Sequence, residues 1–132
     1  MPPKKQSSVP FLNFASLDNV LVRPKKSAAD FDGALTRATR PGAASNDGQL
    51  NRLNGILRGI EQTLTHPQGL AGREWYRHMI YAPGLFTGYG VKTLPGICEA
   101  IEGHWQDVDQ NMAIVAGALD AYSRRFNEAK AP

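Results

Sequence analysis

The chain has 132 residues, of which 42% are hydrophobic and 20% are charged, and its net charge is +3 at pH 7. This length and composition are typical of one globular domain with a core of its own. No apolar run approaches the ~18 residues that a membrane span needs. The single cysteine, Cys98, excludes an internal disulfide and a cysteine-based zinc site.

The chain starts with MPPKKQSSVP, which is basic but lacks the apolar stretch of a signal peptide. We expect a short disordered tail over residues 1–8 and one folded domain over residues 9–130. Residues 1–42 contain seven Lys/Arg and three Asp. We interpret this basic part as a solvated helix face plus a loose tail, although it could also steer an acidic partner.

A first helix is predicted from Phe14, because apolar residues recur at spacings of three and four. The predicted core-facing stripe consists of Phe14, Leu17, Leu21, Pro24, Ala28, Phe31 and Leu35. Pro24 is anomalous, since proline in a helix interior removes a backbone hydrogen bond and costs ~3 kcal/mol. We expect a break or a strong kink: either the helix bends at Arg23, or a second helix begins with Pro24 in its first turn.

A second helix is predicted after the turn-rich loop of residues 40–48, with Asp47 as its cap. It should end near Thr65, before Pro67 and Gly69. Its apolar stripe is Leu50, Leu53, Ile56, Leu57, Ile60 and Leu64.

The following segment, about residues 66–95, has no helical period and is rich in glycine and proline. Its aromatic content argues against disorder. We predict one long ordered loop with a short strand or turn at Arg77–Tyr81. A loop of this length in a compact domain is usually functional or packed by its own side chains.

Two further helices are expected. Pro95 marks the first turn of one helix, whose stripe is Ile97, Ile101, His104 and Trp105. The other has the cleanest stripe of the chain: Val108, Met112, Val115, Leu119, Tyr122 and Phe126. The sequence thus predicts an all-α, four-helix-bundle-like domain of four or five helices with one long ordered loop.

The residues of catalysis and metal binding are scattered. The histidines, His66, His78 and His104, have no metal-ligand spacing, and no phosphate- or dinucleotide-binding motif is present. We interpret His78 and His104 as packing residues and Cys98 as a small buried residue rather than a nucleophile. The residues alone predict a non-catalytic helical module without a metal site.

The segment HPQGLAGREWYRHMIYAP, followed after a short gap by LPGICEAI, closely resembles the C-terminal helical domain of the glutamate carboxypeptidase II and transferrin receptor family. The resemblance extends from Val9 to Ala129 and is most specific between Pro67 and Ile101. It implies a dimerisation domain that forms a homodimer or higher oligomer and packs against a zinc-dependent peptidase domain. In the family the zinc ions, their ligands and the catalytic glutamate belong to that peptidase domain, so no cofactor and no catalytic residue are implied for this chain.

The resemblance also implies a role for the loop before the LPGI helix. In glutamate-specific members a lysine and the next tyrosine bind the carboxylate of the substrate. Tyr89 corresponds to that tyrosine, but Gly88 stands at the lysine position, so a charge-assisted contact is missing. Lys92 could replace it only if the loop bends differently. We expect four residues to anchor the loop to the helices: Tyr76, Arg77, His78 and Tyr81.

Two other functions are compatible with the sequence. A basic helical module could bind nucleic acid or an acidic protein through Lys25, Lys26, Arg37 and Arg40, and a residual enzyme could use the surroundings of His78. We favour the dimerisation domain and expect no nucleic-acid partner. Helix faces that a peptidase domain would cover are exposed in the chain by itself. Such exposed apolar faces favour association between chains.

Overall fold

The computed structural model describes residues 10–42, 46–103 and 107–130. This part of the chain forms, in order, α1 (Ala15–Ala38), α2 (Asp47–Gly59), the 3-10 helix η1 (Glu61–Leu64), β1 (Tyr81–Pro83), β2 (Val91–Thr93), α3 (Pro95–Glu102) and α4 (Val108–Lys130). The predicted all-α class is confirmed, with a two-stranded hairpin inside the long loop. The predicted tail at residues 1–8 and the stripe residues His104 and Trp105 lie outside the described residues.

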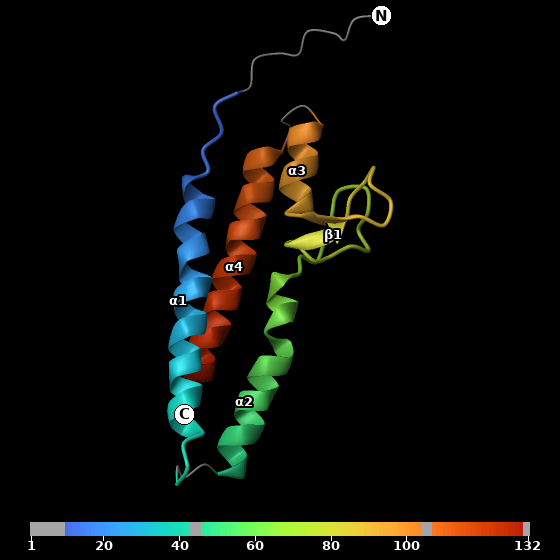
Figure 1. The fold of residues 1–132 in the computed structure, drawn as a ribbon. Coiled ribbons are helices and arrows are strands. Elements are labelled where there is room, and N and C mark those ends of the chain that lie inside the picture. The colour runs from blue at the N-terminus through green and yellow to red at the C-terminus, as the bar shows by residue number, and fades with distance from the viewer. Residues whose placement is uncertain (1–9, 43–45, 104–106, 131–132) are drawn as a thin grey trace, which may run out of the picture.

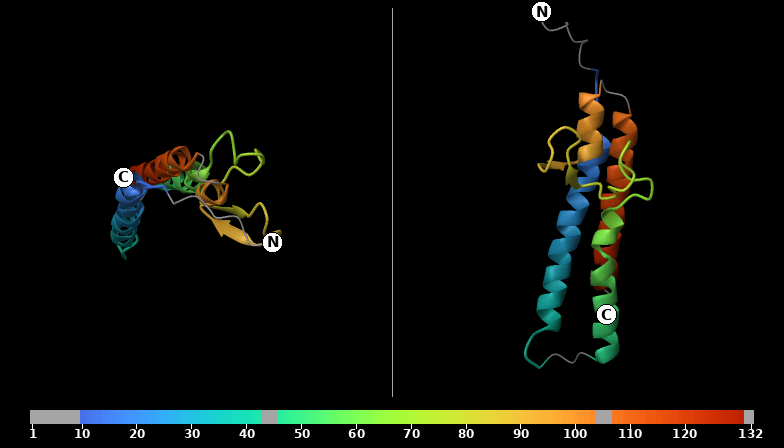
Figure 2. Two further views of the ribbon diagram at one scale, coloured as in Figure 1. Left: turned by 90° about the horizontal axis from the view of Figure 1, so that it is seen from above. Right: turned by 90° about the vertical axis from the view of Figure 1, so that its right-hand side faces the viewer.

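The central element is α4, which contacts α1, α2, η1 and α3. Figure 1 shows α1 on one side of α4 and α2 on the other, with α3 and the hairpin at the upper end, and Figure 2 shows the same order from above. The predicted α4 stripe is confirmed: Val108, Met112 and Val115 are each 2% exposed. No helix of the described residues is long and apolar enough to cross a membrane.

The expected break in the first helix is wrong, because α1 runs without interruption through Pro24. The face of α1 that is buried also differs from the predicted stripe. Leu17 and Ser27 are buried, whereas Phe14, Leu21 and Leu35 are 38%, 48% and 36% exposed. The physical reason is that α1 lies at the edge of the helical layer (Figure 2) and packs mainly on α4, which covers only one flank of a wide apolar stripe.

The second helix is capped by Asn46 rather than by the predicted Asp47. The side chain of Asn46 accepts the backbone N–H of Gln49 at 2.8 Å, and the side chain of Gln49 accepts the backbone N–H of Asn46 at 3.3 Å. Asn46 has the extended backbone that a cap requires, while Asp47 is already helical. η1 then continues the helical path to Leu64, one residue before the predicted end.

The long loop closes the upper end of the core. Leu70, Met79 and Ala82 from the loop pack in one cluster with Ile97 of α3 and with the upper half of α4. The strand lies at Tyr81–Pro83 rather than over Arg77–Tyr81, because its partner is β2, with Ala82 opposite Lys92. α3 begins at Pro95 as predicted.

Candidate functional site in the loop between η1 and α3

The strongest polar contact of the loop joins Arg73 to Glu99 of α3. The guanidinium Nη2 donates to both carboxylate oxygens of Glu99, at 2.6 and 2.7 Å. The Arg73 and Glu99 side chains are only 8% and 15% exposed. A charge-assisted ion pair that is largely buried and uses both carboxylate oxygens is strong and directional. It therefore fixes the loop against α3.

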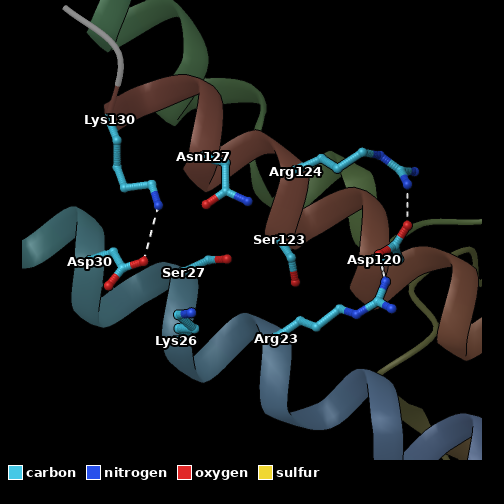
Figure 3. A pocket seen from close by; sticks show the side chains of 9 residues that line it. All are labelled: Arg23, Lys26, Ser27, Asp30, Asp120, Ser123, Arg124, Asn127 and Lys130. Carbon is cyan, nitrogen blue, oxygen red and sulfur yellow. Dashed lines mark hydrogen bonds and ion pairs between the residues drawn. The ribbon is translucent and has the colours of Figure 1, made fainter.

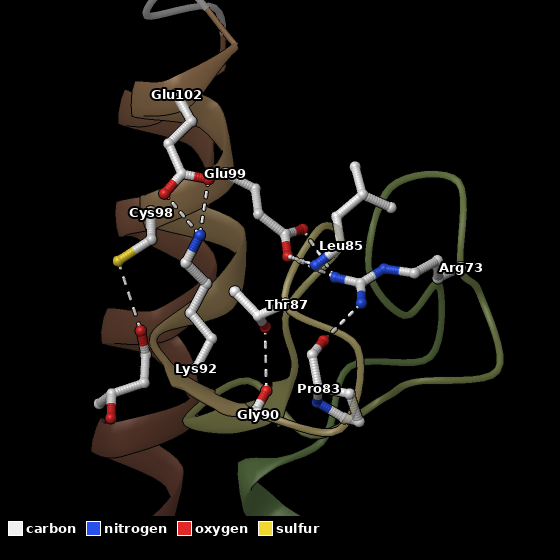
Figure 4. A network of polar contacts seen from close by, with 10 residues as sticks. Arg73, Pro83, Leu85, Thr87, Gly90, Lys92, Cys98, Glu99 and Glu102 are labelled. Carbon is white, nitrogen blue, oxygen red and sulfur yellow. Dashed lines mark hydrogen bonds and ion pairs between the residues drawn. The ribbon is translucent and has the colours of Figure 1, made fainter.

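The same pair organises the hairpin (Figure 4). The other terminal nitrogen of Arg73 donates to the carbonyl of Pro83 at the end of β1. Glu99 also accepts the backbone N–H of Leu85, at 3.0 Å. The Arg73 guanidinium lies 5.4 Å from the centroid of the Tyr76 ring, a cation–π distance. Arg73 and Glu99 therefore position both the start of the hairpin tip and the ring of Tyr76.

A second cluster joins the loop to η1 through His78 and Tyr81. The rings of His78 and Tyr81 lie 4.0 Å apart, and the Tyr81 hydroxyl donates to Glu61 at 2.6 Å. His78 Nδ1 accepts the backbone N–H groups of Ile80 and Tyr81, both at 3.3 Å. His78 Nε2 faces Glu61 at 3.9 Å. The hydrogen bond to Glu61, and then the negative charge of that carboxylate, raise the pKa of Tyr81.

The other two expected anchor residues contribute backbone atoms. The carbonyl of Tyr76 accepts the N–H of Leu70 at 2.9 Å, and the carbonyl of Arg77 accepts the N–H of His66 at 2.8 Å. The Arg77 side chain is exposed. Of the four residues, His78 and Tyr81 share one cluster, Tyr76 stacks near Arg73, and Arg77 takes part through its main chain.

The hairpin tip of residues 84–90 carries the two residues that the resemblance assigned to a substrate pocket. The backbone turns through Gly88, which has φ +58° and so favours a residue without a Cβ atom. Tyr89 and Phe86 next to this turn are fully and 84% exposed. The turn is closed by the Thr87 hydroxyl, which donates to the carbonyl of Gly90 at 3.1 Å. The tip thus presents two aromatic rings and no charged side chain.

Lys92 is not available to this tip. Its Nζ donates to both carboxylate oxygens of Glu102 on α3, each at 2.6 Å, and its side chain is 18% exposed. Figure 4 shows Lys92 lying along α3, away from the hairpin turn. The loop therefore does not bend in the way that would let Lys92 replace the missing lysine. Gly88, at the turn, supplies no cation either.

Cys98 and His78, the side chains considered for catalysis, make local contacts. No group of three or more His, Cys, Asp or Glu that could hold a metal ion occurs among them. Cys98 is half-buried, and its thiol donates to the carbonyl of Thr93 at 3.4 Å. His78 is held by backbone N–H groups and faces Glu61, without a nucleophile among these contacts. The arrangement can position a loop and present its tip.

Sequence reasoning missed the pair that holds the loop most firmly. Arg73 and Glu99 are 26 residues apart, and no periodicity connects them. The available signal was that Arg73 lies inside a segment rich in aromatic residues and glycine. If folding buries an arginine there, its charge needs a partner of opposite charge. That signal could have identified Arg73 but not Glu99.

Comparison with known proteins is consistent with this geometry. Residues 12–127 match the transferrin receptor-like dimerisation domain family. A probable glutamate carboxypeptidase of Arthroderma benhamiae is 47% identical over 58 residues, which are 43% of this chain and 8% of that protein. The probable glutamate carboxypeptidase LAMP1 of Arabidopsis thaliana is 33% identical over 79 residues, 54% of this chain and 12% of that protein. An inactive zinc metalloprotease of Schizosaccharomyces pombe is 26% identical over 116 residues, 87% of this chain and 14% of that protein.

The chain thus corresponds to a small part of the length of each of these relatives. Neither the family nor the relatives support the alternative of a nucleic-acid-binding module. The match covers α1 through most of α4, including the whole loop and its anchors. The chain therefore belongs to the family of transferrin receptor-like dimerisation domains.

Proposed function

We propose that this chain is a non-catalytic dimerisation domain of a glutamate carboxypeptidase-like protein and that it forms a homodimer or higher oligomer. The observation that carries the proposal is the incomplete burial of the apolar stripes. Leu21 and Leu35 of α1 and Leu50 of α2 occupy core-type positions but remain 48%, 36% and 45% exposed. These side chains are apolar surface that a partner would cover.

The gain from covering them is appreciable. Full burial of a leucine side chain contributes about 1.5–3 kcal/mol. Since each of the three is already more than half buried, covering the remainder adds roughly 1 kcal/mol per residue on the same scale. Association must also offset lost rotational and translational freedom, so further apolar residues have to join. Val22, which is 67% exposed on α1, is available for this.

Sedimentation velocity across the micromolar range tests the association. We expect a dimer or larger species whose proportion grows with concentration. Leu50→Glu should weaken association at least tenfold, because it places a charge on apolar contact surface. Asn51→Glu, which adds the same charge at the next exposed position of α2, is the matched control and should have a smaller effect. A compact monomer at every concentration would refute the proposal.

The hairpin tip supports a second, finer proposal for a longer parent protein, in which Tyr89 faces the substrate pocket of a neighbouring peptidase domain. The supporting observations are the full exposure of Tyr89 and the fixed tip geometry held by Glu99 and Arg73. Because Gly88 has no side chain and Lys92 is bound to Glu102, the tip lacks the cation that a terminal glutamate would need. We therefore expect a weak preference for acidic substrates.

The parent protein tests this through substrate preference. Gly88→Lys should raise kcat/KM for a peptide ending in glutamate relative to one ending in leucine, and Gly88→Gln is the control, because it adds a side chain at the same left-handed position without the charge. An unchanged ratio would contradict the role of the tip. The chain by itself should leave a panel of peptides intact with or without added zinc. Hydrolysis that disappears in His78→Ala would instead place catalysis in this chain.

A further inference from the structure

A polar groove separates the C-terminal half of α4 from the middle of α1. Its volume is about 450 Å³. Every lining residue is polar or charged: Arg23, Lys26, Ser27, Asp30, Asp120, Ser123, Arg124, Asn127 and Lys130. Ser27 and Ser123 are 6% and 3% exposed. Two helices in contact normally bury apolar side chains, so a buried serine on each helix at this contact is unusual. The two serine hydroxyls lie at the base of the groove.

The charges that line the groove do not balance. Four cationic side chains face two carboxylates. Asp120 receives two guanidinium groups, from Arg23 at 2.6 Å and from Arg124. Asp30 receives Lys130 at 3.1 Å. Lys26 has no ion-pair partner among the described residues. The lining therefore has an excess of two positive charges. One is the charge of Lys26, and the other remains because Arg23 and Arg124 share the single negative charge of Asp120.

Several hydrogen-bond donors are also unused. Among the described residues, the Ser27 hydroxyl and the Asn127 amide make no hydrogen bond. Ser123 donates to the carbonyl of Leu119 at 2.8 Å, so its oxygen is held in place. In Figure 3 the side chains of Ser27, Ser123 and Asn127 point into the space between the helices, while the ion pairs lie at its two ends. Neutral donors in the middle with cations around them form a suitable environment for an oxyanion.

We propose that this groove binds a small oxyanion with two negative charges, such as inorganic phosphate. Lys26 and the two guanidinium groups that share the single charge of Asp120 supply the positive charge, and the Ser27 hydroxyl and the Asn127 amide supply hydrogen bonds. Asp120 and Asp30 keep Arg23 and Lys130 extended across the two ends of the groove. A divalent anion matches the excess of two positive charges, so its binding removes the repulsion between cations on α1 and α4. The site is independent of the proposed dimerisation.

The test is a phosphate titration of the ¹⁵N-labelled chain at constant ionic strength and pH 8, followed by amide chemical shifts. We expect saturable shifts at Ser27, Ser123 and Asn127. Lys26→Gln should weaken binding at least fivefold, and Ser27→Ala at least twofold. Lys25→Gln removes the same charge from the neighbouring exposed position outside the groove, and it should change the affinity by less than twofold.

Sulfate, also a dianion, should compete with phosphate, whereas chloride at equal ionic strength should not. Shifts that never saturate would overturn the proposal. Equal losses in Lys25→Gln and Lys26→Gln would also overturn it, since they would indicate attraction to the general positive charge of the chain. Because Lys26 is exposed, its substitution should leave the circular dichroism spectrum unchanged, which separates loss of binding from loss of folding.

Discussion

Replacing Glu99 by glutamine should destabilise the domain far more than an ordinary change on a helix surface. The substitution keeps the size of the side chain but removes the charge that faces Arg73. The Arg73 side chain, which is 8% exposed, then stays buried without a counter-charge. Glutamine can keep only one oxygen acceptor for the two groups that now use Glu99, the Arg73 guanidinium and the N–H of Leu85.

The magnitude follows from the burial of the pair. Removing one partner of a buried ion pair costs about 3–5 kcal/mol. Glutamine retains part of the hydrogen bonding, and Glu99 is 15% exposed, so we expect about 2–3 kcal/mol for Glu99→Gln, which is at or below the lower limit of that range. For a domain of 132 residues, 1 kcal/mol corresponds to roughly 3–5 °C in Tm. The expected loss is therefore about 6–15 °C, measured by thermal and urea unfolding at one fixed protein concentration.

A matched control lies one turn further along the same helix. Glu102 pairs with Lys92 at 2.6 Å, but its side chain is 50% exposed. Glu102→Gln should cost less than about 1 kcal/mol, because exposed pairs contribute little. A double-mutant cycle with Arg73→Met should show a coupling of more than about 1 kcal/mol for Glu99. If Glu99→Gln costs no more than Glu102→Gln, the loop is not held by this pair and the reasoning is refuted.

Three further predictions follow from the helices and the η1 contact. Pro24→Leu should raise the free energy of unfolding by up to about 3 kcal/mol, because α1 is continuous at Pro24 and the substitution restores a backbone donor; an unchanged or lower urea midpoint would contradict this. Asn46→Ala should cost about 1 kcal/mol through loss of the capping box, whereas Asp47→Ala should cost less in the same assay. The raised pKa of Tyr81 means that its hydrogen bond to Glu61 stabilises the fold fully below pH 10 and is lost as the pH rises through the higher folded value. Ultraviolet titration should show one tyrosine that ionises late, and Glu61→Gln should return it toward the others; no late tyrosine would argue against the contact.

Much of the fold was predictable because its causes are local. The α4 stripe from Val108 to Leu119 was predicted as core and is buried. The start of α3 followed from Pro95, whose fixed φ suits a first helical turn. The cap of α2 was misplaced by one residue, because both Asn46 and Asp47 are good cap residues and only the backbone conformation distinguishes them.

The candidate site was less predictable. The long loop was predicted from its lack of helical period, and Gly88 and Tyr89 were identified from the resemblance; their role in a substrate pocket stays a prediction. Arg73 and Glu99, which hold the loop, were not recognised, nor was the contact of Lys92 with Glu102. These pairs join positions whose closeness depends on how the loop folds back on α3, and no short-range pattern encodes that path.

The sequence by itself determined which segments are helical and which family the chain resembles, because helix period, caps and proline positions act between neighbours in the chain. Only the tertiary structure decided which flank of α1 is covered. One apolar stripe was visible in the sequence, but α4 packs against Leu17 and leaves Leu21 and Leu35 exposed. Burial depends on what lies opposite a side chain, and in this open layer of helices α1 has α4 as its main partner. The remaining apolar surface is the part of the stripe that we propose another chain covers.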